Sequence, residues 1–167
     1  MIENYSSIEL MNKIDFPYNL QISENVIVEL KKTYHKYKEF EVGGLLFGKI
    51  DIKNSVVSVE HIEMVKSKKI FKLSYIRSNK IAQQIIDHIW RKSDGLFNYL
   101  GEWHTHPNIE PVPSNTDKST ILKQTLEKNS LYFPYTILLI IGSEEKISLT
   151  ISNSRRIIAC THIQKEE

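Results

Sequence analysis

The chain has 167 residues, of which 41% are hydrophobic, and this length and composition predict one compact domain with a single core. Its 22 basic and 20 acidic residues nearly balance, so the charge indicates neither a nucleic-acid partner nor an anionic membrane. No apolar run approaches the roughly 20 residues of a membrane-spanning helix, and the amino terminus has no signal pattern, so we expect a cytoplasmic protein.

Cys160 is the only cysteine, which excludes an internal disulfide and leaves nitrogen and oxygen atoms as the ligands of any bound metal. It lies in the apolar run "IIAC", and we expect it to be buried in the core. A metal site must therefore be sought among the histidines and carboxylates.

The first half of the chain indicates a polar extension, a helix and several strands. We assign residues 1–17, which begin with about fifteen residues rich in polar side chains and end with "DFP", to an extension before a domain at 18–167. Ser23 precedes a segment whose apolar spacing suits a helix packed on one face, although "VIVEL" within it also fits a strand. The helix is predicted at 24–37, and strands are predicted at 19–22, 43–52, 56–65 and 70–76.

The second half predicts two more helices among strands. Apolar residues recur at three- and four-residue spacing over 79–92, and a third helix is predicted at 114–128 after a Pro-rich loop. The remaining strands are predicted at 96–106, 135–142, 146–152 and 156–163. Helices interspersed with antiparallel hairpins favour an α+β fold in three layers, with one mixed sheet flanked by about three helices.

The stretch "GEWHTHPNIEPVPSNTD" carries the most distinctive chemistry in the chain. In a strand, alternation places Glu102, His104 and His106 on one face, with the Cα atoms of the two histidines roughly 6 to 7 Å apart. Two imidazoles at that spacing can bind one ion. Pairs of this kind also occur on solvated strand faces, so the pair alone does not establish a metal site.

Ser114 and Asp117 have two interpretations. "SNTD" fits a helix capping box, in which neither residue needs a function. Alternatively, His104, His106 and Asp117 supply two nitrogens and one oxygen with a fourth position open, which is the ligand set of a hydrolytic zinc ion. The sequence pattern leaves both interpretations open, and they are compatible with each other.

The arrangement "HTHPNIEPVPSNTD", with "EVGGLLFG" upstream, resembles the signature of the JAB/MPN metalloproteases, also called JAMM proteins. The resemblance implies the MPN fold, which is related to cytidine deaminases, over about residues 18–163. It implies one zinc ion per chain, held by His104, His106 and Asp117, with Glu41 as the general base and acid. It also implies that Ser114 donates a hydrogen bond to the oxyanion of the tetrahedral intermediate.

Two points about the catalytic residues remain open at this stage. Glu41 is followed by two glycines that could simply close a helix or permit close strand packing. Glu102 is the rival base, because alternation places it on the same face as the histidines.

The segment "GEWHTHP" resembles the corresponding segment of prokaryotic JAB proteins that are encoded beside ubiquitin-type conjugating enzymes, including those of anti-phage CBASS operons. This similarity implies an isopeptidase that cleaves after the C-terminus of a ubiquitin-like protein or of a conjugated operon-encoded enzyme. The alternatives are a non-catalytic MPN interaction subunit and a hydrolase of another small amide. A metal-dependent barrel hydrolase is disfavoured, because such barrels typically need about 250 residues.

Overall fold

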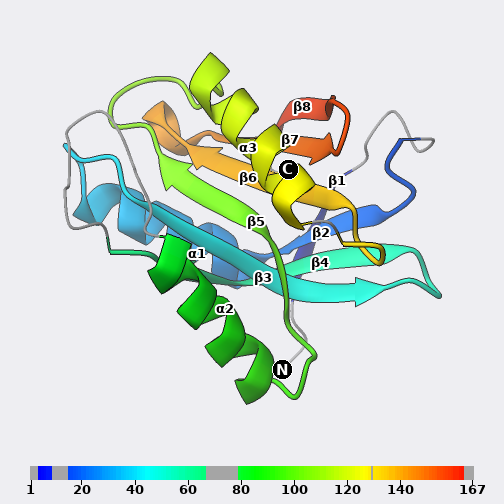
Figure 1. The fold of residues 1–167 in the computed structure, drawn as a ribbon. Helices are drawn as coiled ribbons and strands as arrows, with labels where there is room; N and C mark the ends of the chain where they lie inside the picture. Colours follow the sequence, from blue (N-terminus) through cyan, green and yellow to red (C-terminus); the bar gives the residue numbers. More distant parts are fainter. Residues whose placement is uncertain (1–3, 9–14, 67–78, 129, 164–167) are drawn as a thin grey trace.

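The computed structural model describes residues 4–8, 15–66, 79–128 and 130–163, which form a sheet of eight strands and three α-helices (Figure 1). The helices are α1 (Glu24–Lys36), α2 (Asn79–Lys92) and α3 (Asn115–Lys128), and a short 3-10 helix, η1, spans Ser143–Glu145. The strands are β1 (Tyr5–Ile8), β2 (Asn19–Ser23), β3 (Gly43–Asp51), β4 (Val56–Met64), β5 (Asn98–Thr105), β6 (Tyr135–Ile141), β7 (Ile147–Asn153) and β8 (Ile157–Ile163).

The strands form one sheet in the order β1-β2-β4-β3-β5-β6-β7-β8. The pairs β2 with β4 and β5 with β6 are parallel, and all the other neighbouring pairs are antiparallel. The predicted mixed sheet is therefore confirmed. Strand β5, which carries His104, lies in the interior of the sheet between β3 and β6.

The helices cover both faces of the sheet, as Figure 1 shows. Helix α1 packs Val26 and Leu30 into the largest core cluster, against one face that includes Trp103. On the opposite face, α2 packs Ala82 and Ile89 against β3, and α3 packs Ile121 against β6. The predicted three-layer α+β architecture is confirmed.

The first helix begins where its sequence predicts. The Ser23 side chain accepts a hydrogen bond from the Asn25 amide at 3.2 Å, which satisfies one of the free N–H groups of the first turn. Val26 and Leu30, four residues apart, form the buried face of α1. The strand interpretation of "VIVEL" is wrong, because this cap and this spacing support a helix.

Part of the predicted extension packs with the sheet. Strand β1 pairs antiparallel with β2, and Phe16 is 1% exposed in an aromatic cluster with Phe133 and Tyr135. The division of the chain at residue 17 stays a prediction. The predicted strand at 70–76 lies outside the described residues.

The expectation for Cys160 is wrong, because the residue is exposed. Strand β8 pairs only with β7 in the described part of the sheet, so this edge strand lacks the neighbours that bury an apolar run in the interior. None of the described helices is long and apolar enough to cross a membrane.

Candidate metal centre

Strand β5 directs His104 toward the face of the sheet that α2 and α3 cover. His104 is paired with Ile140 on β6, which belongs to the cluster beneath α3, whereas the next residue, Thr105, is paired with Ile141 of the α1 side. The period-two alternation of a strand produces this separation. His104 is 7% exposed, so little of its side chain is in contact with solvent.

His106 follows the last residue of β5, but its backbone still donates to the carbonyl of Ile141 at 2.8 Å. Its Nδ1 lies 3.3 Å from the carbonyl oxygen of Glu110 in the loop that follows. Because a carbonyl can only accept, this contact requires a proton on Nδ1, and in the neutral imidazole the lone pair is then on Nε2. The loop therefore sets the tautomer that metal binding through Nε2 requires.

The first turn of α3 forms the predicted capping box. The Asp117 amide donates to Ser114 Oγ at 3.1 Å, and Asp117 Oδ2 accepts from the Ser114 amide and hydroxyl, both at 2.7 Å. These bonds use Oδ2, whereas Oδ1 faces His104. Capping therefore orients the Asp117 carboxylate instead of competing with a ligand role.

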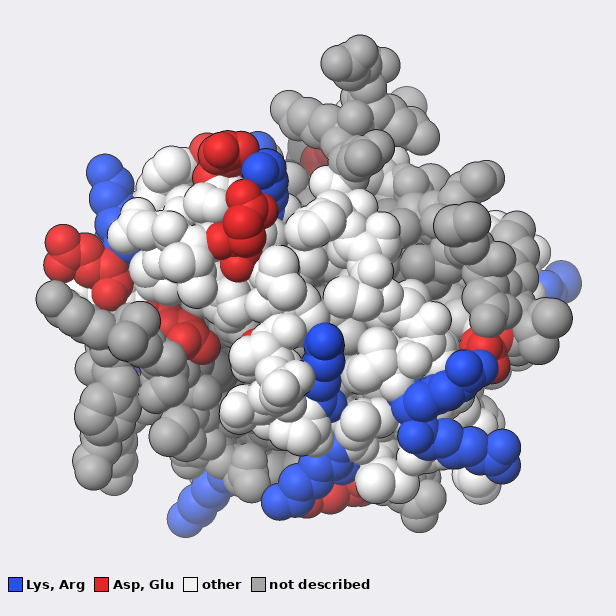
Figure 2. Space-filling view, turned by 90° about the horizontal axis from the view of Figure 1, so that it is seen from above, with Lys and Arg blue, Asp and Glu red and all other residues white. Residues whose placement is uncertain are grey.

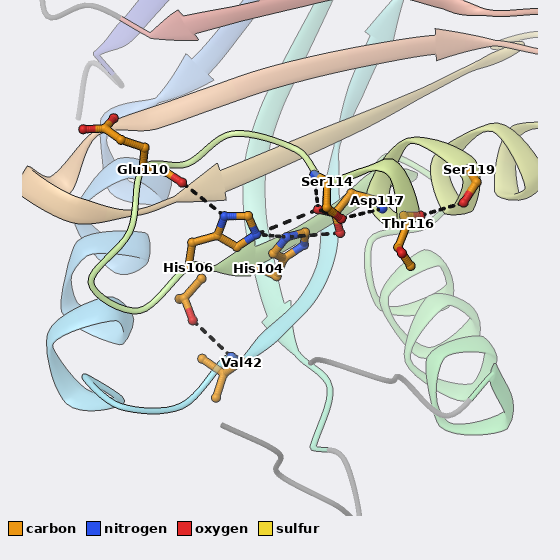
Figure 3. A network of polar contacts seen from close by, with 9 residues as sticks. Val42, His104, His106, Glu110, Ser114, Thr116, Asp117 and Ser119 are labelled. Carbon is orange, nitrogen blue, oxygen red and sulfur yellow. Dashed lines mark hydrogen bonds and ion pairs between the residues drawn. The ribbon is translucent and has the colours of Figure 1, made fainter. Parts of the chain in front are cut away.

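The three predicted ligands converge, as Figure 3 shows for His104, His106 and Asp117. Their ligand atoms all lie within 4.8 Å of one another, and this is the one such group found among the described residues. The two Nε2 atoms are 3.1 Å apart, and they lie 3.6 and 3.9 Å from the nearer carboxylate oxygens of Asp117. A tetrahedral ion with bonds of about 2.0 to 2.1 Å holds its ligand atoms about 3.4 Å apart, so these residues fit zinc in spacing and in donor type.

The charge state of His104 also suits a ligand. Burial lowers the pKa of His104 to about 4, against the opposing effect of the neighbouring Asp117 carboxylate. The imidazole is therefore neutral at pH 7, and its lone pair is available to a metal.

The two candidate bases occupy different positions. Glu102 is 9% exposed and lies between Leu45 on β3 and Leu138 on β6, two residues before His104 on the same face. Glu41 precedes β3, whose pairing with β5 ends at Gly43 opposite His104. The glycines after Glu41 belong to β3 and do not end a helix; a Cβ at Gly44 would collide with the Glu63 carbonyl of β4.

The sequence did not indicate the supports of His106. The Glu110 carboxylate pairs with Lys146 at 3.0 Å, and the Ser143 amide donates to the carbonyl of Ile109 at 2.8 Å. A Cβ at Gly142 would collide with this loop. A backbone carbonyl such as that of Glu110 leaves no signal in the residue pattern, so this group was found only from the structure.

Comparisons with known proteins identify the family of the chain. Residues 23–157 match the model of a family described as prokaryotic homologs of the JAB domain. A "Probable metalloprotease y4qB" of Sinorhizobium fredii is 30% identical over 107 residues, which are 61% of this chain and 63% of that protein. A "CD-NTase/cGAS isopeptidase" of Escherichia coli is 31% identical over 112 residues, which are 65% of this chain and 70% of that protein.

Among solved structures, protein DSY2949 of Desulfitobacterium hafniense matches with a TM-score of 0.62 at 20% identity. The match covers 87% of this chain and 92% of that protein, and it supports the fold alone. The chain spans less than two thirds of the length of the y4qB relative.

Proposed function

The chain belongs to the family of prokaryotic homologues of the JAB domain, and from this premise we propose that it is a zinc-dependent isopeptidase. The observation that carries the proposal is the convergence of His104, His106 and Asp117 within 4.8 Å. The proposed substrate is the amide bond after the C-terminus of a ubiquitin-like protein or of a conjugated enzyme. The names of two relatives, CD-NTase/cGAS isopeptidase and probable metalloprotease, support a peptidase of this kind, and we further propose that it acts in anti-phage defence.

In this proposal His104, His106 and Asp117 hold one zinc ion. A zinc ion with three protein ligands supplies a water of lowered pKa and polarises the substrate carbonyl. The contact of His106 Nδ1 with the Glu110 carbonyl and the capping bonds of Asp117 keep both side chains directed at the centre. Rigid ligands of this kind reduce the reorganisation that metal binding costs.

Glu41 is the proposed general base and acid. If the β3–β5 register continued by two residues beyond Gly43 and His104, Glu41 would lie opposite His106 on the face of the ligands, which supports this role. Paired positions bring Cβ atoms to about 5 Å, which is within reach of a group beside the metal. Glu102 is less suited, because it lies deeper in the sheet between two leucines.

Ser114 is the proposed oxyanion donor. Its hydroxyl now donates to Asp117 Oδ2, and a hydroxyl has one proton to donate. Donation to the substrate therefore requires rotation of the hydroxyl away from Asp117, while the amide of Ser114 keeps its own bond to that carboxylate. The exposure of Ser114 leaves room for this rotation beside the centre.

The surface beside the site suits a protein substrate. Ile109 and Val112 are 56% and 58% exposed on the loop between His106 and Ser114. Figure 2, the view from above, shows on this face a mostly uncharged described surface with both basic and acidic side chains, so the described part of this face is not covered by charge of one sign. Exposed apolar residues beside a catalytic centre favour a folded partner that presents an extended tail.

Metal analysis of the purified protein tests the proposal. We expect about one zinc ion per chain in the wild type, and a large loss of zinc in His104→Ala, His106→Ala and Asp117→Ala. Lys123→Met, on the exposed side of α3, is the matched control and should keep its zinc. Full zinc occupancy in all three ligand variants would exclude this centre.

A further inference from the structure

We propose that Thr105, the residue between the two histidines, is a positioning residue that holds Glu41 in place for proton transfer. The inference rests on the proposed function, in which Glu41 is the base. The Thr105 hydroxyl accepts from the Val42 amide at 3.1 Å and donates to the Phe40 carbonyl at 3.3 Å. It therefore binds the peptide groups on both sides of Glu41, and the bond to Val42 is drawn in Figure 3.

These bonds extend the pairing of two strands beyond its regular end. The register of β3 with β5 ends at Gly43 and His104, and the Thr105 amide still donates to the Val42 carbonyl at 2.8 Å. In a regular antiparallel pair the Val42 amide would donate back to the backbone of the same partner. Here the hydroxyl of Thr105 is the acceptor instead. A side chain therefore holds the segment around Glu41, where the regular backbone hydrogen bonds between β3 and β5 have ended.

The segment around Glu41 depends on such contacts. Residues 37–42, between α1 and β3, form turns and irregular backbone. Val42 is 6% exposed and Thr105 is 1% exposed, so the hydroxyl bonds lie where little water competes for them. Thr105 points to the α1 side of the sheet, away from the ligand face, and reaches Glu41 only through the backbone.

A purely structural role predicts different behaviour. If Thr105 only satisfies the buried Val42 amide, its loss lowers the stability of the protein. It then weakens kcat, substrate binding and metal binding to a similar extent. If Thr105 positions the base, its loss lowers kcat while substrate and metal binding remain. A displacement of about 1 Å of a reacting group can cost about a hundredfold in rate, so a loosened backbone is enough to produce this effect.

The test replaces the hydroxyl with a methyl group of the same size. We expect Thr105→Val to lower kcat about tenfold on a ubiquitin-like fusion substrate, with KM and the zinc dissociation constant changed less than about twofold. Thr105→Ser should restore most of kcat because it returns the hydroxyl. Thr136→Val is the control: Thr136 is fully buried on β6, and its hydroxyl has no hydrogen-bond partner among the described residues.

A double-mutant cycle identifies the residue through which Thr105 acts. In the Glu41→Gln background, Thr105→Val should change kcat less than about twofold, because the base it positions is already lost. Equal losses in both backgrounds, or weakened zinc binding, would overturn the inference and leave the proposed function intact. A wild-type rate in Glu41→Gln would refute the base assignment and the inference together.

Hydrogen exchange tests the same contact without a substitution. The Val42 amide should exchange slowly in the native wild-type protein, because its partner is buried. Exchange as fast as that of an exposed loop amide would show that the hydrogen bond from the Val42 amide to the Thr105 hydroxyl does not form. This result does not depend on whether the variants fold.

Discussion

Replacing Ser114 with alanine separates the two roles that this residue combines. The substitution removes the acceptor of the Asp117 amide at 3.1 Å and one of two donors to Asp117 Oδ2 at 2.7 Å. Loss of a helix cap of this kind costs about 1 kcal/mol. For a chain of this size, 1 kcal/mol lowers Tm by about 2 to 4 °C, so we expect a shift in that range.

The same change should act on the metal centre and on the rate. Asp117 loses one of the hydrogen bonds that direct its other oxygen at His104. Removing a residue that hydrogen-bonds a metal ligand typically costs about 10- to 100-fold in metal affinity, and we expect a loss of about tenfold in zinc affinity here. At saturating zinc, kcat should still fall by about 10² to 10³, the usual scale for one oxyanion donor. Ser114→Thr keeps the hydroxyl and the cap, and it should retain most of each property.

Three measurements check these values: thermal unfolding, competition with a chromophoric chelator, and hydrolysis of an isopeptide-linked substrate at saturating zinc. A wild-type kcat in Ser114→Ala at saturating zinc, together with a lower Tm, would show that Ser114 only caps α3. An unchanged Tm would refute the reasoning about the cap.

Three further predictions concern the base, a partly buried lysine and the substrate. Glu41→Gln should keep zinc and lower kcat by about 10² or more, whereas Glu102→Gln should have a much smaller effect; the reverse order would assign the base to Glu102. Burial at the end of α3 lowers the pKa of Lys128 to about 7, where its Nζ donates to the Tyr135 carbonyl at 3.0 Å. Above pH 7 the unfolded chain then binds more protons than the folded one, so the free energy of unfolding should rise from pH 7 to 10; urea titrations of Lys128→Met should show a smaller rise, and equal slopes would contradict the shift. Fusions to the C-terminus of ubiquitin-like proteins should be cleaved faster than casein, followed by mass spectrometry, because docking of the folded partner orients the scissile bond; equal rates would indicate a general peptidase.

Much of the architecture follows from local pattern. The Ser23 cap and the spacing of Val26 and Leu30 define α1. The alternation of β5 directs His104 and Thr105 to opposite faces of the sheet. The Ser–x–x–Asp spacing likewise predicted the cap of α3. These features depend on residues within a few positions of one another, and helical and strand periodicities are set at that range.

The exposure of Cys160 could not be predicted in this way. Its neighbours are apolar whether β8 lies inside the sheet or at its edge, and only the strand order decides which is the case. The same applies to the supports of the site: the Glu110 carbonyl meets His106 only because the loop packs on the turn at 142–146.

The sequence by itself determined the identity and spacing of the candidate ligands, because the chemistry of two imidazoles and a carboxylate belongs to the residues themselves. Only the tertiary structure decided that Asp117 lies 3.6 and 3.9 Å from the two histidines. These distances require α3 to pack against β6 on the same face of the sheet as the His104 side chain. It also decided that Thr105 binds both neighbours of Glu41 across more than sixty residues of chain. Contacts between distant segments depend on how the whole core packs, and no local period encodes them.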